Sequence, residues 1–311
     1  MKSFALSLAL CATFATADAW AVTIDWVAVG NPGNGNDPAT GFGNVAHSYN
    51  IDKYDVTNSQ YVEFLNAKAT GADPLGLYNS NMSDPTYGGI TYNGSTYSVV
   101  SGDGNHPVNF VTFFDTLRFA NWLNNGQGNG DTESGAYILQ GGTPTPSNAN
   151  TIARQAGATV FLPSENEWYK AAFYNAGDSS YLKYATGSNL VPTPTGPTAT
   201  PNSANYGGVV GNLTDVGAYT GTTSPYGAYD MGGNVWQWNE GLALFGKRGS
   251  RGSSFFTLGS DNLDSISGGY DNPTTERKDY GFRVASVPEP STFALAGLGF
   301  IGLAAWRLRR R

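Results

Sequence analysis

The sequence predicts a loop-rich exported fold with few regular elements, and its composition is the first observation in support. Charged residues make up only 13% of the 311 residues, where a typical soluble domain has about a quarter. Glycine occurs 41 times, while seven Trp, 16 Phe and 18 Tyr supply the apolar surface of a core. The low charge therefore indicates loops and not disorder. The body of the chain has no basic patch, so nucleic acid is not expected as a partner.

Short elements with recognisable boundaries are the second observation. Alternating, β-rich residues predict strands over 22–29 and 45–54. Three further segments have the spacing of a helix-opening capping box, followed by apolar residues on one helical face. They begin at Thr57, Thr112 and Ser164, and they predict the only substantial helices. Two Thr/Pro-rich stretches are interpreted as surface loops within one domain. These stretches are 141–148 and 191–201.

The stretch 224–239 combines a glycine turn with large apolar residues, and the rest of the chain is expected to be organised around it. The glycines permit positive φ, and the apolar residues of the Val235–Trp238 run must be buried to be stable. Burial would bring the Asp230 carboxylate and the turn carbonyls together, and such oxygens are the ligands of calcium. The alternative is a tight turn that leads into a core strand without an ion, and spacing alone favours it.

Both ends of the chain have the features of processing signals. Residues 1–21 contain a lysine, an apolar run and a small-x-small sequence, which predict a secretory signal peptide. The single cysteine, Cys11, lies inside it, so the mature protein is predicted to contain no thiol and no disulfide. The last residues, 287–311, contain Pro-Glu-Pro, the apolar segment 293–306 and an arginine-rich end. That segment falls short of the roughly twenty residues that span a bilayer, but its terminal position and the arginines predict a membrane helix before processing.

Few residues are available for common catalytic arrangements. The only histidines are His47 and His106, with no carboxylate at a suitable spacing for an iron site. Neither histidine lies near a Gly-x-Ser-x-Gly turn, so a serine triad has no support. Glu165 and Glu167 have the form of a carboxylate pair for glycoside cleavage. Glu167 is better explained as the capping-box residue of the helix that follows Ser164.

Six ordered blocks resemble the formylglycine-generating enzyme family, also called the sulfatase-modifying-factor family. The resemblance implies an α+β fold over residues 22–286, irregular, loop-rich and related to C-type lectins. The C-terminal residues 287–311 resemble the PEP-CTERM sorting signal of Gram-negative bacteria, which implies recognition by an exosortase and cleavage near Pro-Glu-Pro. The six blocks are 53–66, 106–112, 162–172, 230–238, 251–255 and 281–283.

The founding activity of this family is oxygen-dependent oxidation of a substrate cysteine at two copper-binding cysteines. Alignment on the Arg251–Phe255 block places Thr257 and Asn262 where those cysteines stand, and Ser254 at the position of the active-site serine. Neither Thr257 nor Asn262 can form a thiolate or hold Cu(I). The formylglycine-generating reaction is therefore excluded, and copper and iron are not expected as cofactors.

The resemblance also implies a calcium site. Its ligands would be side-chain oxygens of Asp230 and Gln237 and the carbonyls of Gly233 and Val235. Gln237 replaces the family's glutamate, which removes one negative charge and should weaken the site. Asn205 would belong to a second family site, whose remaining ligands fall where this chain is shorter.

The expected function is non-catalytic binding or a structural role in the cell envelope or the exopolysaccharide matrix. Export would bring the protein to the periplasm, the cell surface or the extracellular matrix, with an exosortase as the processing partner. The expected ligand is a carbohydrate or a protein. The alternative is a metal-dependent oxidoreductase of the same family with an unknown substrate. The predicted binding residues, in a polar loop on a rigid frame, are Ser254, Thr257, Asn262, Asp264 and Tyr270.

Overall fold

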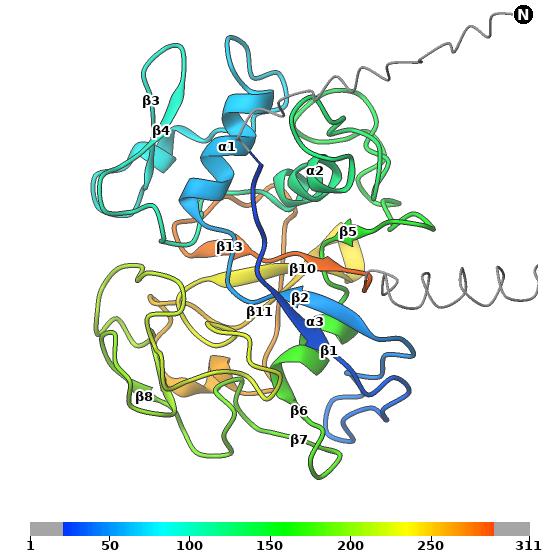
Figure 1. Cartoon of the computed structure of the whole chain (residues 1–311), viewed down its shortest axis with the longest axis vertical. Helices are drawn as coiled ribbons and strands as arrows, with labels where there is room; N and C mark the ends of the chain where they lie inside the picture. Colours follow the sequence, from blue (N-terminus) through cyan, green and yellow to red (C-terminus); the bar gives the residue numbers. More distant parts are fainter. Residues whose placement is uncertain (1–20, 289–311) are drawn as a thin grey trace, which may run out of the picture.

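Two four-stranded sheets form the centre of the computed structural model, which describes residues 21–288 (Figure 1). The first sheet is antiparallel and has the order β1-β2-β14-β5. Its strands are β1 (Trp26–Val29), β2 (Tyr49–Asp52), β14 (Ala285–Ser286) and β5 (Val160–Phe161). The first and last strands of the chain therefore belong to the same sheet. The fold is mixed α+β and rich in loops, as the sequence predicts.

The second sheet has the order β12-β11-β10-β13, and its only parallel pair joins β10 to β13. Its strands are β12 (Gly269–Asp271), β11 (Arg248–Arg251), β10 (Trp236–Leu242) and β13 (Tyr280–Phe282). Apart from these sheets and the α-helices, residues 21–288 contain three two-stranded ladders and three short 3-10 helices. The ladders are β3 (Ile90–Tyr92) with β4 (Tyr97–Val99), β6 (Tyr174–Asn175) with β7 (Ser180–Tyr181), and β8 (Thr193–Pro194) with β9 (Ser203–Ala204). The 3-10 helices are η1 (Ser80–Ser83), η2 (Leu244–Gly246) and η3 (Ser260–Leu263).

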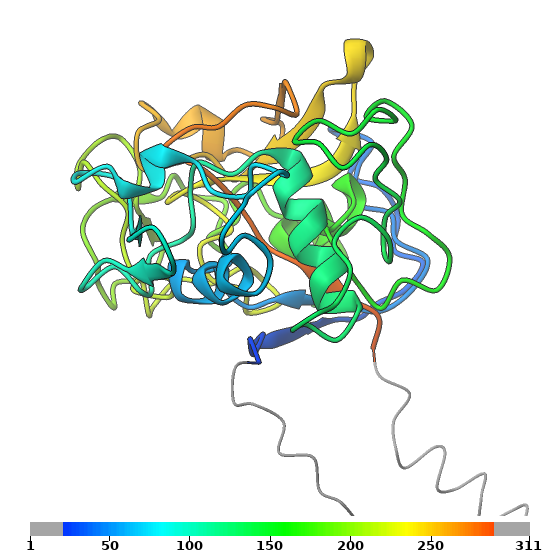
Figure 2. The same ribbon diagram turned by 90° about the horizontal axis from the view of Figure 1, so that it is seen from above.

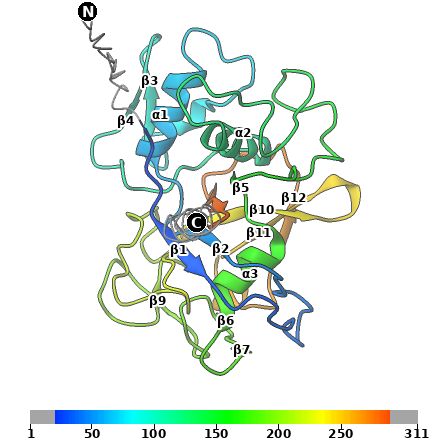
Figure 3. The ribbon, with the colours of Figure 1, turned by 45° about the vertical axis from the view of Figure 1, so that its right-hand side comes forward.

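The three α-helices begin where the capping boxes predict. They are α1 (Asn58–Lys68), α2 (Phe113–Asn124) and α3 (Glu165–Phe173). In each helix the cap hydroxyl accepts the N3 backbone N–H, and the N3 side chain accepts the N–H of the cap residue. Helices α1 and α2 lie on one side of the sheets and α3 lies on the other (Figures 1 and 3).

The strands are shorter than the sequence predicts, because parts of the predicted runs are held by other groups. In the 22–29 run, only the residues of β1 pair with a strand. The backbone N–H and C=O of Val22 instead bond to the Gln127 side chain, at 2.6 and 2.8 Å. In the 45–54 run, Val45 accepts a hydrogen bond from Gly33 in a preceding turn at 2.8 Å.

The 224–239 stretch is buried in part: Val235 and Trp238 lie in the core as predicted, whereas Trp236 is half-buried. Val235 and Trp238 are fully buried, and the Trp238 indole donates to the Val111 carbonyl at 3.1 Å. The turn before them has positive φ at three residues, including Gly233 at 92°. A Cβ at Gly233 would lie 2.7 Å from the Asn205 carbonyl oxygen, so this position requires glycine.

The two ends of the described chain leave from one side of the molecule (Figure 2). The β10–β11 hairpin and the segment around η3 lie on the opposite side (Figure 2). Within residues 21–288 no helix has the length and apolarity to cross a membrane. The predicted signal peptide and the predicted C-terminal membrane helix lie outside the described residues.

Candidate functional site

Arg251, the last residue of β11, fixes the loop that the sequence singles out for binding. Its side chain is buried, and it forms an ion pair with Glu165 at the start of α3. Its Nη1 donates to the carbonyls of Ser265 and Ser267 at 3.1 and 2.6 Å. Through Arg251 the loop is therefore attached to β11 and α3. This attachment fixes the position of the side chains that the loop exposes.

Ser254 lies in a buried polar cluster directly after Arg251. Its hydroxyl donates to Asp279 Oδ2 at 3.0 Å, and the Thr257 hydroxyl lies 3.0 Å from the same serine oxygen. Asp279 in turn accepts two hydrogen bonds from Arg277, at 3.0 and 3.2 Å. The Asp279 carboxylate is therefore shared between the Ser254 hydroxyl and the Arg277 guanidinium.

The surface of this loop differs from the polar surface that the sequence suggests. Phe256, Leu258, Ile266 and Tyr270 are exposed by 53%, 79%, 67% and 39%, and we call these four residues the loop face. Lys278 lies between two aromatic rings at the edge of this face, with Nζ 3.9 Å from the ring centroid of Phe256 and 4.0 Å from that of Tyr87. An apolar surface with a cation held on aromatic rings is suited to binding a partner.

The structure brings together only part of the predicted binding set. Ser254 and Thr257 are in contact, and Tyr270 lies on β12 opposite Gly249. Asp264 instead forms an ion pair with Lys183 at 3.3 Å, in a recess of about 340 Å³ that Ile266 of the loop face also lines. Asn262 is half-buried on η3. The five residues therefore belong to more than one surface.

At the predicted calcium site, the Gln237 side chain is fully engaged by protein groups. Its Oε1 accepts hydrogen bonds from the Trp168 indole at 2.8 Å and from Arg283 Nε at 2.7 Å. Its Nε2 donates to the Asp230 carbonyl at 2.8 Å. A carbonyl oxygen has two lone pairs, and both are used here, one of them by a guanidinium. Gln237 therefore does not fit the role of a cation ligand.

The other predicted calcium ligands lie nearby but have different surroundings. Asp230 Oδ2 accepts the Gly217 N–H at 2.6 Å, and burial raises the pKa of Asp230 to about 6, opposed by this bond and by Arg283. Gly233 and Val235 are in the adjoining turn and strand entry. Asn205 contacts Asn234 through Nδ2 at 3.1 Å, and its Oδ1 is buried without a partner among the described residues. Calcium binding by this chain stays a prediction.

A charge cluster around the buried Glu167 was not predicted from the sequence. Arg154 donates to Glu167 at 2.6 and 3.0 Å and to Glu240 at 2.7 and 2.9 Å. Glu167 is also the capping residue of α3, as predicted, and His47 lies 3.0 Å from its carboxylate. Burial alone would raise the pKa of Glu167, but Arg154 and Ser164 hold that pKa below its usual value. No local motif indicates this cluster, because Arg154 and Glu240 are 86 positions apart.

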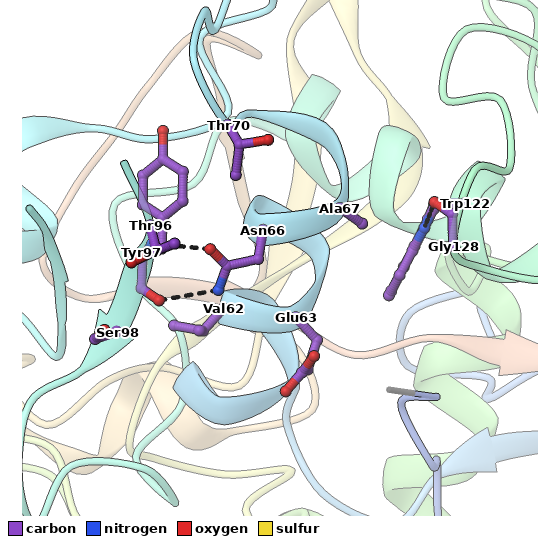
Figure 4. A pocket seen from close by; sticks show the side chains of 10 residues that line it. All are labelled: Val62, Glu63, Asn66, Ala67, Thr70, Thr96, Tyr97, Ser98, Trp122 and Gly128. Carbon is purple, nitrogen blue, oxygen red and sulfur yellow. Dashed lines mark hydrogen bonds between the residues drawn. The ribbon is translucent and has the colours of Figure 1, made fainter. Parts of the chain in front are cut away.

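The largest cleft that we describe lies between α1 and β4, away from the loop face (Figure 4). Its volume is about 570 Å³, and its lining is mainly apolar. The Asn66 amide in its wall is occupied at both ends by the Tyr97 backbone, at 2.9 Å each. Glu63 is the one charged residue that lines the cleft, and burial raises its pKa.

Among residues 21–288, no group of three or more His, Cys, Asp or Glu is placed to hold a metal ion.

This architecture defines a class of protein: an irregular α+β domain of the C-type-lectin-like kind, with an anchored loop beside a small sheet. Residues 26–287 match the model of the sulfatase-modifying factor enzyme 1-like domain, and the chain belongs to that family. Residues 286–311 match the PEP-CTERM protein-sorting motif. That motif implies export, surface sorting and processing by an exosortase.

Solved structures of the same fold include "Treponema denticola variable protein 1", with a TM-score of 0.55 and 18% identity. The match covers 85% of this chain and 95% of that one. The structure of CarF gives a TM-score of 0.54 at 20% identity and covers 86% of this chain and 99% of that chain. These similarities support the fold.

Curated relatives match over part of their length. Serine/threonine-protein kinase pkn1 of Chlamydia caviae is 24% identical over 260 residues, which are 77% of this chain and 33% of the kinase. Hercynine oxygenase of Mycolicibacterium smegmatis is 29% identical over 137 residues, which are 43% of this chain and 22% of the oxygenase. The chain thus spans about a third or less of the length of these relatives.

Proposed function

We propose that this protein is a surface-sorted, non-catalytic binding protein that holds a carbohydrate or protein ligand on its loop face. The sorting motif supports delivery to the cell surface or the surrounding matrix. The binding role is supported by one observation above the others: Arg251 fixes a loop that presents four exposed apolar side chains. A rigidly held loop of this kind is a common way to build a binding surface.

The position of the loop face is consistent with this role. The backbone segment around η3, from which its side chains come, lies on the side of the molecule opposite the two ends of the described chain (Figure 2). A protein attached through its C-terminal residues would therefore present this side away from the point of attachment. Tyr270 and Phe256 can stack on apolar faces of a sugar or a peptide, while neighbouring polar groups orient the ligand.

The surroundings of Ser254 support a role without catalysis. A serine nucleophile needs a base that accepts its proton. The carboxylate that accepts the Ser254 hydroxyl is Asp279, which also accepts hydrogen bonds from Arg277. The two histidines lie elsewhere: His47 contacts Glu167, and His106 lies 3.6 Å from Asp103 and 3.7 Å from Asp215.

A glycan array tests the proposal directly. The exported chain is screened beside the variant Asn262→Ala/Asp264→Ala/Tyr270→Ala and beside Phe256→Ser/Leu258→Ser. Trp26→Ser is the matched control, because Trp26 is also an exposed aromatic residue but lies on β1 in the other sheet. We expect the control to bind and Phe256→Ser/Leu258→Ser to lose binding. Full binding by both loop variants would place the site elsewhere.

The competing proposal is a metal-dependent oxidoreductase, and the partial match to hercynine oxygenase is its support. Metal analysis of the purified chain separates the two proposals. Copper or iron at one equivalent per chain would favour the oxidoreductase. Absence of both metals, together with glycan or protein binding, would favour the binding protein.

A further inference from the structure

A second recess lies near the loop end of the β10–β11 hairpin, where Leu242 pairs with Arg248, at the other end of β11 from Ser254. Its volume is about 230 Å³, close to the share of eight water molecules in the liquid. Its apolar wall consists of Phe113, Ile152, Ala153 and Leu242. Its polar wall consists of Tyr137, Arg154, Glu240 and Arg248, and Arg154 is already paired with Glu240 and Glu167. We call it the hairpin recess. It does not overlap the loop face.

Arg248 is the unusual residue of the hairpin recess. It is only 3% exposed, and its guanidinium carbon lies 4.6 Å from the ring centroid of Phe113. Its Nη2 donates to the carbonyls of Ala149 and Ile152, at 3.0 and 3.3 Å. Its Nε has no hydrogen-bond partner within the part of the chain that the structure describes. A buried guanidinium with an unused donor is costly unless another group satisfies it.

The nearby carboxylate, Glu240, pairs with Arg154 and Tyr137 and not with Arg248. Glu240 Oε1 accepts the Tyr137 hydroxyl at 2.5 Å and Arg154 Nε at 2.9 Å, and Oε2 accepts Arg154 Nη2 at 2.7 Å. Among residues 21–288, no carboxylate forms an ion pair with Arg248. The charge of Glu240 lowers the cost of burying Arg248, but burial still lowers the pKa of this arginine.

We propose that the hairpin recess binds a small hydroxylated carboxylate, such as a single sugar acid. The carboxylate of the ligand would accept hydrogen bonds from Arg248, which provides the strong charge-assisted donor that such groups select. A ligand hydroxyl would donate to Glu240, whose second oxygen has one recorded donor. The apolar residues Ile152 and Leu242 would contact the ring. The hairpin recess shares no residue with the loop face, so either proposal can be refuted while the other stands.

Calorimetric titration of the full chain with D-glucuronate tests the proposal, and D-glucose is the control ligand without a carboxylate. We expect glucuronate to bind and glucose to bind at least about tenfold more weakly. Arg248→Met should reduce glucuronate affinity by about tenfold or more, while Arg248→Lys should retain part of it. Lys247→Met is the matched control, since it removes the same charge from the adjacent exposed position.

A second pair of variants keeps the test valid if Arg248→Met does not fold. Leu242 and Leu244 are both exposed, but only Leu242 lines the hairpin recess. Leu242→Trp should fill the recess and abolish glucuronate binding, and Leu244→Trp should leave it unchanged. Equal binding of glucose and glucuronate, no detectable binding by the native chain, or full binding by Leu242→Trp would overturn the proposal.

Discussion

Replacement of Arg283 by methionine is the sharpest test of how this fold is held together. Arg283 is fully buried and connects four segments of the chain. It donates to Gln237 Oε1 at 2.7 Å, to the Asp52 carbonyl at 3.0 Å, and to Asp55 Oδ1 and the Tyr229 carbonyl at 2.9 Å each. Methionine preserves much of the side-chain volume but removes the charge and all four hydrogen bonds.

The expected loss in the free energy of unfolding follows from Asp55, which would stay buried without its partner. Asp55 is itself fully buried, and its Oδ2 already has no partner among the described residues. Removal of one member of a buried ion pair typically costs about 3–5 kcal/mol, because the other charge stays buried and unpaired. For a domain of this size each kcal/mol lowers the melting temperature by roughly 2–4 °C. We therefore expect the melting temperature to fall by about 6–20 °C.

Equilibrium urea unfolding, followed by tryptophan fluorescence, measures this loss. Trp168 is a suitable reporter because its indole shares the Gln237 oxygen with Arg283. Arg283→Lys is the control, since it keeps the charge but not the planar set of donors, and it should recover part of the stability. A loss below about 1 kcal/mol for Arg283→Met would refute the reasoning, because it would mean that Asp55 does not depend on this partner.

Three further predictions concern acidity, calcium and processing. Burial raises the pKa of both Asp52 and Asp115 to about 7. The Arg283 charge partly offsets the rise at Asp52, and hydrogen bonds from Thr112 partly offset it at Asp115. The folded state then binds more protons than the unfolded state between about pH 4 and 7, so the free energy of unfolding should decrease from pH 5 to pH 7. Asp52→Asn should flatten this slope in urea titrations, and an increase over the same range would contradict the assignment. If Asp230 and the turn carbonyls bind calcium, chelation with EGTA should lower the melting temperature by several degrees, and Asp230→Ala should remove this effect. A shift below about 1 °C would contradict the calcium prediction. Mass spectrometry of the exported fraction should find a chain that begins near Val22 and lacks residues 293–311, and an intact tail there would exclude this processing.

Local features of the fold were predictable from the sequence. A capping box involves residues three positions apart, so Thr57, Thr112 and Ser164 set the start of each helix whatever lies around them. The glycine turn and the apolar run of 235–238 were also visible in the sequence, but their partners, Asn205 at Gly233 and Val111 at Trp238, lie far away in the chain. Strand ends were less predictable, because a strand continues only where a partner strand offers hydrogen bonds.

The candidate site depended on contacts that no local pattern contains. The resemblance implies that Gln237 is a calcium ligand, yet its oxygen is taken by Trp168, 69 positions away, and by Arg283, 46 positions away. The sequence of the loop after Arg251 is mostly polar. In the structure the carbonyls of Ser265 and Ser267 anchor the loop to Arg251, and the larger apolar side chains of the loop are exposed to solvent. The sequence by itself determined where helices and turns begin, since those depend on short-range hydrogen bonds. The tertiary structure alone decided which oxygens and charges remain free, because burial and long-range pairing set the energy of each polar group.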